Sequence, residues 1–314
     1  MPMEQLTMPL VRVTEAASRS AANWIGRGEK EEGDGAAVEA MRQAMSQVPM
    51  DGEVVIGEGE KDEAPMLYNG EKVGSGQGAQ VDIAVDPVEG TKFLANGMPG
   101  AICVMAVAPA GEMFRPGPGF YMRKLVVPPR ARGKVDINAP LASQLGDLAS
   151  ALGKPVEDLR IFVLDKPRHK DMIKEIQAAG AGVRLASDGD VSGGVMAALG
   201  ESVDALMGTG GTPEGVITAC AAKAVGGDML GYLDPQAEDE DQKLREHGLE
   251  PHQVLAMDDL IKGDNVLFVA TGLTSSDILD GVHHHGDRTF TDTMVITGAH
   301  GTVKRIHTDK PENR

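Results

Sequence analysis

The segment 81–91 places two acidic side chains directly after a strand pattern. Apolar residues alternate up to position 85, which predicts a β-strand. Pro87 lacks the N–H group that a ladder needs, so we expect Asp86 and Glu89 to lie just past the end of that strand. A Gly-Thr turn follows them. Two carboxylates held together on such a turn need a cation, so the segment predicts a site for a metal ion and a phosphate.

Further acidic residues stand beside glycine or proline, among them Asp34, Glu58 and Glu214. Carboxylates on tight turns are the usual ligands of Mg²⁺ or Mn²⁺, and the chain has no Cys and His cluster typical of structural zinc. Alone, each acid is also explained as a surface charge or a helix cap. Asp34 precedes a predicted helix at 35–47, so it either caps this helix or lends its carboxylate to a ligand. The joint pattern favours metal binding for Glu214 and for the pair after the strand.

The glycine-rich segment 208–215 is similar to a phosphate-binding turn. Its glycines would let backbone N–H groups approach oxygen atoms, and the N-terminus of the following helix would favour an anion. A flexible strand-to-helix turn is the alternative explanation. No Gly-Lys-Ser/Thr sequence follows, so the segment does not indicate binding of a nucleoside triphosphate.

Charged residues follow two other predicted strands. Lys166 and Arg168 open a helix, and their side chains suit a phosphate or a charged sugar substituent, although a solvated helix start explains them equally well. Asp188 and Asp190 either cap a helix or accept hydrogen bonds from sugar hydroxyls. The cluster His283-His284-His285 lies among polar residues and glycines without acidic partners at metal spacing, so we expect a loop there.

Nucleophile motifs are absent from the sequence. There is no Gly-x-Ser-x-Gly motif with a supporting His and Asp. We therefore expect hydrolysis by direct attack of water on a metal-bound ester.

The composition narrows the class of protein. With 314 residues, of which 41% are hydrophobic, the chain is expected to form two domains with aliphatic cores. A net charge of −17 argues against a nucleic acid or an anionic membrane as partner, because both need a basic face. No apolar run reaches the roughly 18 residues of a membrane-spanning helix. Cys103 and Cys220 lie in apolar surroundings, which predicts two free thiols and a cytoplasmic protein.

The order of the predicted elements divides the chain at a proline-bearing stretch. Residues 1–132 are expected to form an α+β metal-binding domain with an antiparallel sheet. Residues 133–314 alternate strands with helices, which predicts an α/β domain with a mostly parallel sheet and substrate-binding loops at the carboxyl ends of its strands. The first domain is expected to have helices at 8–25 and 35–47 and strands at 54–56, 81–86, 101–108 and 121–127. The second is expected to have strands at 160–164, 182–186, 203–207, 265–270 and 293–297, and helices at 168–179, 191–199, 213–225 and within 234–251. A hairpin through 298–301 is expected, with a frayed end after His307.

Several segments resemble the class II fructose-1,6-bisphosphatases, in the superfamily of lithium-sensitive, metal-dependent sugar and inositol phosphatases. The superfamily motif Asp-Pro-Ile/Val-Asp/Glu-Gly-Thr is present at residues 86–91, and segments similar to class II follow in family order over almost the whole chain. These segments are Gly26-Arg27-Gly28-Glu29-Lys30, residues 55–68, Lys166-Pro167-Arg168-His169, Ser187-Asp188-Gly189-Asp190-Val191 and Gly210-Gly211-Thr212-Pro213-Glu214-Gly215.

The resemblance implies roles for particular residues. The implied metal ligands are Asp34, Glu58, Asp86, Glu89 and Glu214. The implied substrate contacts are Glu89, Gly90, Thr91, Tyr121, Lys166, Pro167, Arg168, Asp188, Gly189, Asp190 and Gly211. The implied catalytic residues are Thr91, which would orient the attacking water, Glu89, and Lys30 near the metal site.

The resemblance also implies a layered αβαβα sandwich and a phosphoric monoester hydrolase that uses Mn²⁺ or Mg²⁺. The implied reaction removes the C1 phosphate of fructose 1,6-bisphosphate in gluconeogenesis, in the cytoplasm. A dual fructose and sedoheptulose bisphosphatase is the alternative, and a non-catalytic regulator that binds a sugar phosphate is a more remote one. The expected partners are a small sugar bisphosphate and further copies of the chain, as a dimer or tetramer.

Overall fold

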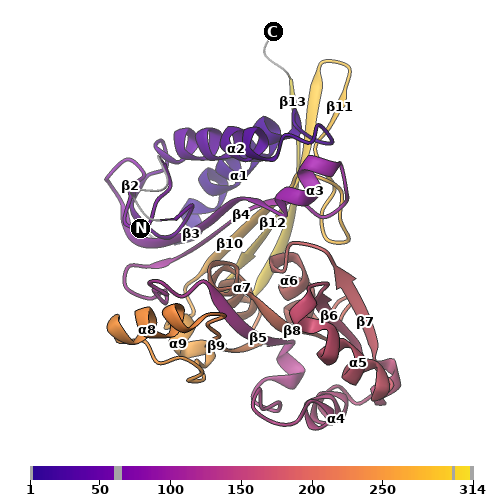
Figure 1. Cartoon of the computed structure of the whole chain (residues 1–314). Helices are drawn as coiled ribbons and strands as arrows, with labels where there is room; N and C mark the ends of the chain where they lie inside the picture. The colour runs from indigo at the N-terminus through magenta and orange to yellow at the C-terminus, as the bar shows by residue number, and fades with distance from the viewer. Residues whose placement is uncertain (1–2, 60–65, 299–300, 312–314) are drawn as a thin grey trace. The chain divides into compact units, whose positions relative to one another are not determined.

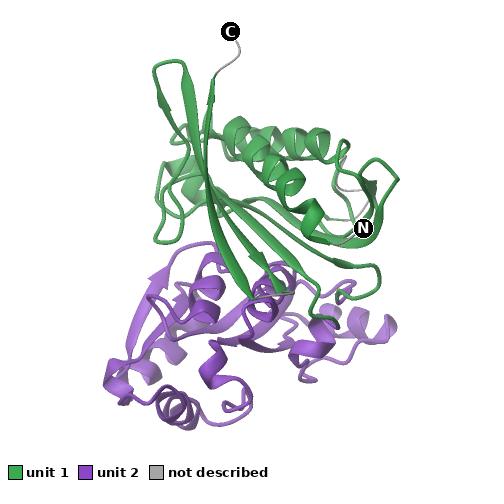
Figure 2. Cartoon of the chain, turned by 180° about the vertical axis from the view of Figure 1, so that it is seen from behind, with its two compact units in different colours: residues 1–113, 263–314 green, residues 114–262 purple. Residues whose placement is uncertain are grey.

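The chain folds into two compact units, described here from a computed structural model that covers residues 3–59, 66–298 and 301–311. Unit 1 comprises residues 1–113 and 263–314, and unit 2 comprises residues 114–262 (Figure 2). Each unit has its own multi-stranded sheet and its own helices. The mixed α/β class that the sequence predicts is therefore confirmed. Among the described residues, every helix is too short or too polar to cross a lipid bilayer.

Unit 1 is built on one large sheet (Figure 1). Its strands run in the order β11-β12-β10-β4-β3-β1-β2, and β13 also pairs with β12. The strands are β1 (Met50–Ile56), β2 (Lys72–Val73), β3 (Ala79–Glu89), β4 (Ile102–Pro109), β10 (Leu267–Gly272), β11 (His283–His285), β12 (Arg288–Thr297) and β13 (Thr302–Pro311). The β1–β3 pair is parallel, whereas the other pairs of this sheet are antiparallel. The predicted antiparallel sheet is thus interrupted at one pair.

The helices of unit 1 lie on one face of this sheet (Figure 1). They are α1 (Thr7–Ala22), α2 (Lys30–Met45) and the short α3 (Thr91–Asn96), with a 3₁₀ turn η1 (Met3–Leu6) before α1. Leu10, Val13, Ala17 and Ala21 recur at helical spacing on α1 and are fully buried. They pack with buried strand residues such as Val269 in one aliphatic core. This core fixes α1 and α2 against the strands that carry the acidic residues.

Unit 2 contains a second sheet in the order β7-β6-β8-β5-β9. The strands are β5 (Tyr121–Val127), β6 (Arg160–Leu164), β7 (Gly182–Ala186), β8 (Ala205–Gly211) and β9 (Asp228–Leu233). β6 is parallel to β7 and β8, as the strand–helix alternation predicts, whereas β5 is antiparallel to both of its neighbours. The carboxyl ends of the three parallel strands and the amino end of β5 therefore meet at one edge.

Helices cover both faces of the sheet in unit 2. The helices are α4 (Leu141–Leu152), α5 (Lys170–Ala178), α6 (Val191–Leu199), α7 (Thr212–Ala224), α8 (Glu238–Glu246) and α9 (Met257–Leu260), with 3₁₀ turns η2 (Pro129–Ala131), η3 (Val156–Asp158) and η4 (Pro167–His169). Leu148 of α4 and Ile176 of α5 pack in one core with Ile161 of β6. Gly193 of α6 faces Phe162, the next residue along β6, whose side chain points to the opposite face. The charge-rich segment 234–251 contains the predicted surface helix as α8.

The two units differ from the predicted domains 1–132 and 133–314, because no single boundary separates them. The strand predicted at 121–127 is β5, which pairs with β8 and β9 and so belongs to unit 2. The strands after Gly263 return to the sheet of unit 1, where β10 pairs with β4. These are long-range pairings, and the composition along the chain gives no local sign of them.

Three smaller expectations differ from the structure. The helix predicted at 35–47 begins at Lys30, so Asp34 lies inside α2 and does not cap it. The segment 283–285 is the short strand β11 and not a loop, because it pairs with β12. The chain after His307 is ordered as β13 up to Pro311. Residues 60–65 of one quoted segment and residues 299–300 of the predicted hairpin lie outside the described residues.

Candidate active site

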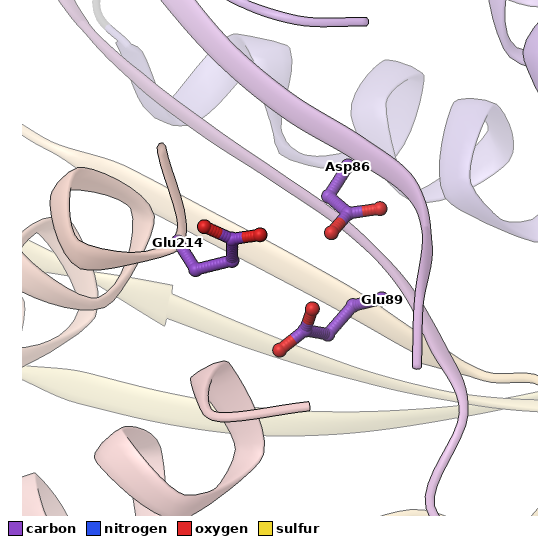
Figure 3. Close-up of side chains that lie close together, drawn as sticks. All are labelled: Asp86, Glu89 and Glu214. Atoms are coloured by element: carbon purple, nitrogen blue, oxygen red, sulfur yellow. The ribbon is translucent and has the colours of Figure 1, made fainter. Parts of the chain in front are cut away.

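A bulge in β3 brings the carboxylates of Asp86 and Glu89 together. Side chains three positions apart in a regular strand point to opposite faces. Here Asp86 pairs with Val104 while Glu89 pairs with Ile102, so β3 contains one extra residue at this point. The extra residue turns Glu89 to the side of Asp86, and one oxygen of each carboxylate lies within 4.8 Å of the other (Figure 3).

Pro87 accounts for the shift in strand pairing, but the strand does not end at this residue as the sequence predicts. Pro87 was expected to end the strand, but β3 continues to Glu89. Because Pro87 has no N–H to donate, the ladder shifts instead of stopping. The N–H of Val88 donates to Oδ1 of Asp86 at 3.0 Å, which fixes that carboxylate locally.

Gly90 allows the chain to turn from β3 into α3. Its φ of 88° is in the left-handed region that glycine favours. Thr91 is the first residue of α3 and follows directly on the turn after Glu89. The predicted water-orienting residue therefore lies two positions after a predicted metal ligand.

Asp34 and Glu58 form a second acidic pair in unit 1. Burial raises the pKa of Glu58 to about 7, and the negative charge of Asp34 adds to the shift. Burial likewise raises the pKa of Asp34, whereas the charge of Lys30, one helical turn away on α2, lowers it. Lys30 thus lies close to Asp34, one of the predicted metal ligands.

Cys103 lies near one residue of each acidic pair. This thiol on β4 is fully buried, and burial raises its pKa well above the usual value. The charges of Asp86 and Asp34 raise it further, so both carboxylates lie near the same sulfur. The acidic side chains of unit 1 therefore gather around one region of the sheet.

The raised pKa of Glu58 predicts a pH-dependent stability of the metal-free protein. Between its unfolded value of 4.5 and its folded value of about 7, the folded state holds a proton that the unfolded state has lost. The free energy of unfolding should therefore decrease as the pH rises through this window, by on the order of 2–3 kcal/mol. Denaturant unfolding in EDTA should show this decrease in the wild type and a smaller one in Glu58→Gln. Equal slopes in both proteins would contradict the assignment, and saturating Mn²⁺ should abolish the difference between low and neutral pH.

In unit 2, the predicted substrate residues meet at the edge where the parallel strands end. Residues 166–168 follow β6, residues 188–190 follow β7, and Gly211 ends β8. Tyr121 begins β5 and pairs directly with Gly211. Side chains that are far apart in the sequence are thus brought together by the sheet topology.

Arg168 and Tyr121 form one side of this edge. The guanidinium carbon of Arg168 lies 5.1 Å from the centre of the Tyr121 ring. Its Nε donates to the carbonyl oxygen of Thr209 at 2.9 Å. Nζ of Lys166 donates to the carbonyl oxygen of Ser187 at 2.7 Å. Both cationic side chains are therefore held by hydrogen bonds to backbone carbonyls.

Removing either cation should weaken substrate binding more than turnover. We expect Arg168→Ala and Lys166→Ala each to raise KM for the sugar bisphosphate that the resemblance implies by about 10-fold to 100-fold, because a charge-assisted hydrogen bond to a phosphate contributes roughly 1.5–3 kcal/mol. The kcat value should change by less than KM. Steady-state phosphate release measures both values, with Lys174→Ala, an exposed lysine of α5, as the control. An unchanged KM in both variants would place the second phosphate elsewhere.

Asp188 and Asp190 differ in their surroundings. Oδ1 of Asp188 lies 3.7 Å from Nζ of Lys166. Asp190 is buried, and its Oδ2 accepts a 2.7 Å hydrogen bond from Nζ of Lys124. Gly189 between them has a φ of 69°, which glycine adopts without strain. Asp190 is the N-cap residue of α6, but its side chain makes no cap hydrogen bond.

Glu214 lies in the first turn of α7 in unit 2 (Figure 3). Its Oε2 is buried and has no hydrogen-bond partner within the part of the chain that the structure describes. Burial raises its pKa, whereas the charge of Lys124 acts in the opposite direction. A buried carboxylate oxygen without a donor is costly, and a cation would remove that cost.

The segment 208–215 passes directly from a strand into a helix. Residues up to Gly211 belong to β8, and α7 begins at Thr212. The glycines here make room for side chains: a Cβ on Gly211 would lie 1.8 Å from Oε2 of Glu214, and a Cβ on Gly210 would lie 2.0 Å from Oδ2 of Asp190. Close packing of acidic side chains explains these glycines.

The acidic groups fit a hard divalent cation. Carboxylate oxygens are the donors that Mg²⁺ and Mn²⁺ prefer, and two pairs of carboxylates in unit 1 suit two ions. The orphaned Oε2 of Glu214 supports the same donor chemistry in unit 2. Burial raises the pKa of Asp34, Glu58 and Glu214, and neighbouring acidic groups add to each shift.

Sequence reasoning missed two residues at the edge of unit 2. Lys124 lies on the same face of β5 as the apolar residues Met122 and Val126. A charged residue at this core-facing position was the sequence feature that could have indicated its role. His169 is buried, and its ring contacts the carbonyl oxygen of Leu164 through Nδ1 at 2.7 Å and accepts the N–H of Thr209 through Nε2 at 2.8 Å. It thereby joins β6 to β8 beside Arg168.

These features describe a class of protein: an enzyme with carboxylates for divalent cations and cationic side chains for a phosphate ester. Comparison with known proteins specifies the family. The family model described as bacterial fructose-1,6-bisphosphatase, glpX-encoded, matches residues 4–310. Fructose-1,6-bisphosphatase 1 class 2 of Escherichia coli (strain K12) is 45% identical over 316 residues, covering 96% of this chain and 94% of the relative. The fructose-1,6-bisphosphatase class 2 of Shigella flexneri has the same identity and coverage. The chain belongs to the class II fructose-1,6-bisphosphatase family.

A solved structure, the extragenic suppressor protein suhB from Bartonella henselae, is also similar. It is 15% identical with a TM-score of 0.36, and the match covers 62% of this chain and 73% of that chain.

Proposed function

We propose that the protein hydrolyses the C1 phosphate of fructose 1,6-bisphosphate to give fructose 6-phosphate and phosphate. The observation that carries this proposal is membership of the class II family over residues 4–310. The groups that such a reaction needs, carboxylates for metal ions and cations for a phosphate, are present in the described residues. The distant alternative of a non-catalytic regulator has no support from the relatives, which are named as bisphosphatases.

We propose that Asp34, Glu58, Asp86, Glu89 and Glu214 hold Mn²⁺ or Mg²⁺. The bound ions would supply charge to the phosphoryl oxygens and lower the pKa of an attacking water. Support comes from the two acidic pairs of unit 1 and from the orphaned oxygen of Glu214 in unit 2.

The residues of the chain would orient the reactants. Thr91, at the start of α3 beside Glu89, would accept a hydrogen bond from the attacking water and align it with the phosphorus. Lys30, which lies near Asp34, would place a positive charge close to the developing negative charge of the phosphoryl group.

The strand-end edge of unit 2 would bind the sugar and its second phosphate. Lys166 and Arg168 are the cations for that phosphate, and the ring of Tyr121 restrains the guanidinium of Arg168. Asp188 and Asp190 would accept hydrogen bonds from sugar hydroxyls. Pro167, Gly189, Gly90 and Gly211 would contribute backbone contacts.

The setting of this activity is also a proposal. A fructose bisphosphatase of this family would act in gluconeogenesis in the cytoplasm, and we expect a homo-oligomer because closed symmetric assemblies are the commonest. The net charge of −17 supports a small-molecule substrate over a nucleic-acid partner.

The test is phosphate release from fructose 1,6-bisphosphate by the purified chain with Mn²⁺ or Mg²⁺. We expect stoichiometric phosphate and fructose 6-phosphate, with no activity in EDTA. A parallel assay with sedoheptulose 1,7-bisphosphate and with myo-inositol 1-phosphate distinguishes the bisphosphatases from a monophosphatase. Binding of the bisphosphate without phosphate release under all these conditions would overturn the proposal.

A further inference from the structure

Lys124 is a fully enclosed cation in unit 2 that the proposed mechanism does not use. It is 1% exposed and lies in the middle of β5. Its Nζ donates to Oδ2 of Asp190 at 2.7 Å. Enclosing an ammonium group is costly unless it is paired, and an ion pair of this kind adds little net stability compared with apolar residues of the same size. The presence of Lys124 therefore calls for a reason besides stability.

The surrounding backbone is shaped around this side chain. Gly208 pairs directly with Lys124 across the β5–β8 ladder. A Cβ on Gly210 would lie 3.1 Å from Nζ of Lys124, and a Cβ on Gly215 would lie 3.2 Å from its Cε. Glycines of the segment that also carries Glu214 thus leave the space that the lysine fills.

The charge of Lys124 acts on two acidic residues of the proposed site. It forms the ion pair with Asp190, which would contact the sugar. It also acts on Glu214, where Asp190 and Asp188 act with the opposite sign. One enclosed cation therefore interacts both with Asp190, the proposed sugar contact, and with Glu214, the proposed metal ligand.

We propose that Lys124 is a positioning residue that fixes the carboxylate of Asp190 for the sugar and balances the negative charge that Asp190 and Glu214 place in one enclosed region. The proposal rests on the proposed function, because it assigns Asp190 to the substrate and Glu214 to the metal. A lysine that served stability alone would affect unfolding without affecting ligand binding.

Unit 2 offers a matched control for that alternative. Lys223, on α7, is 7% exposed, and its Nζ pairs with the carboxylate of Asp258. This is a second enclosed lysine with an acidic partner, but neither residue belongs to the proposed site. Lys223→Met removes the same group as Lys124→Met and tests the cost of losing a buried lysine, here one whose acidic partner is 74% exposed.

The experiment compares both variants with the wild type. Steady-state kinetics give kcat, KM for fructose 1,6-bisphosphate and the Mn²⁺ concentration at half-maximal activity. Titration calorimetry with fructose 6-phosphate in EDTA gives an affinity that requires neither turnover nor metal, and thermal unfolding gives Tm. We expect Lys124→Met to raise KM and to weaken fructose 6-phosphate binding by about 10-fold or more, the range for a hydrogen bond to a charged group. It should also lower the Mn²⁺ requirement, because the loss of a positive charge near Glu214 leaves a more negative site for the cation.

Lys223→Met should lower Tm and leave KM, the sugar-phosphate affinity and the Mn²⁺ requirement within about twofold of the wild type, since the surroundings of Asp190 are untouched. If Lys124→Met fails to fold, Lys124→Gln keeps an N–H donor without the charge, and the same changes are expected.

A Lys124 variant that loses stability but keeps the wild-type KM, sugar-phosphate affinity and Mn²⁺ requirement would overturn the proposal. The proposed function fails separately, when the wild type itself releases no phosphate.

Discussion

Glu89→Gln should lower kcat by about 10³-fold or more at saturating substrate, and Asp86→Asn should do the same. Each change keeps the size of the side chain but removes a negative charge from the pair that the β3 bulge brings together. Losing a metal ligand removes several kcal/mol of transition-state stabilisation, and each 1.36 kcal/mol corresponds to a tenfold change in rate. Phosphate release is measured over a series of Mn²⁺ concentrations, so that weaker metal binding is separated from slower chemistry.

The control for these variants is Glu53→Gln on β1 of the same unit. Glu53 forms an ion pair with Lys72 at 2.8 Å, and Lys72 is largely exposed. A surface pair of this kind contributes about 1 kcal/mol or less, so this variant should keep full activity. If Glu89→Gln or Asp86→Asn retained near wild-type kcat at saturating Mn²⁺, the assignment of the metal site to this pair would be wrong.

Gly211→Ala should reduce activity by about 10²-fold or more and leave stability nearly unchanged. The backbone of Gly211, with φ −65° and ψ 141°, suits alanine. The added Cβ would lie 1.8 Å from Oε2 of Glu214, so the carboxylate has to move away. A displacement of about 1 Å in a reacting group costs on the order of 10²-fold. We expect the Mn²⁺ requirement to rise, because the displaced group is a proposed metal ligand.

Gly146→Ala on α4 serves as the control for this steric argument. A Cβ at Gly146 meets no atom within 4 Å, and alanine is favoured over glycine inside a helix by about 1 kcal/mol. This variant should be as active as the wild type and slightly more stable. Wild-type kinetics and an unchanged Mn²⁺ requirement in Gly211→Ala would show that the position of Glu214 does not matter for activity.

The acidic residues could be predicted from the sequence because their chemistry is local. Asp86 and Glu89 stand at a strand end with proline and glycine beside them, and this local pattern predicts a turn with carboxylates. The bulge could not be predicted, because it is a property of the pairing with β4. Proline removes one donor, but whether the strand then stops or shifts its register depends on the partner strand.

The division into two units depends on pairings that are distant in the sequence. β10 and β12 follow the whole of unit 2 in the chain and yet complete the sheet of unit 1. β5 directly precedes the predicted boundary but pairs with β8 and β9. A proline-bearing stretch such as 126–133 marks a local break in regular structure, and it carries no information about which sheet the strands on either side join.

The glycine-rich segment 208–215 is compatible with two explanations. Glycine allows either a phosphate or a side chain to come close to the backbone. The structure shows side chains in that space, those of Asp190, Lys124 and Glu214. The charged residue at a core-facing position of β5 is the sequence feature that would have favoured this explanation.

The most direct test of the central claim is anomalous diffraction from crystals of the protein with Mn²⁺. We expect manganese within about 2 Å of carboxylate oxygens of Asp86, Glu89 and Glu214, as hard divalent ions require. A second ion is expected at Asp34 and Glu58. Manganese bound elsewhere, or bound without an oxygen of Glu214, would contradict the proposal that these acidic residues hold the metal ions.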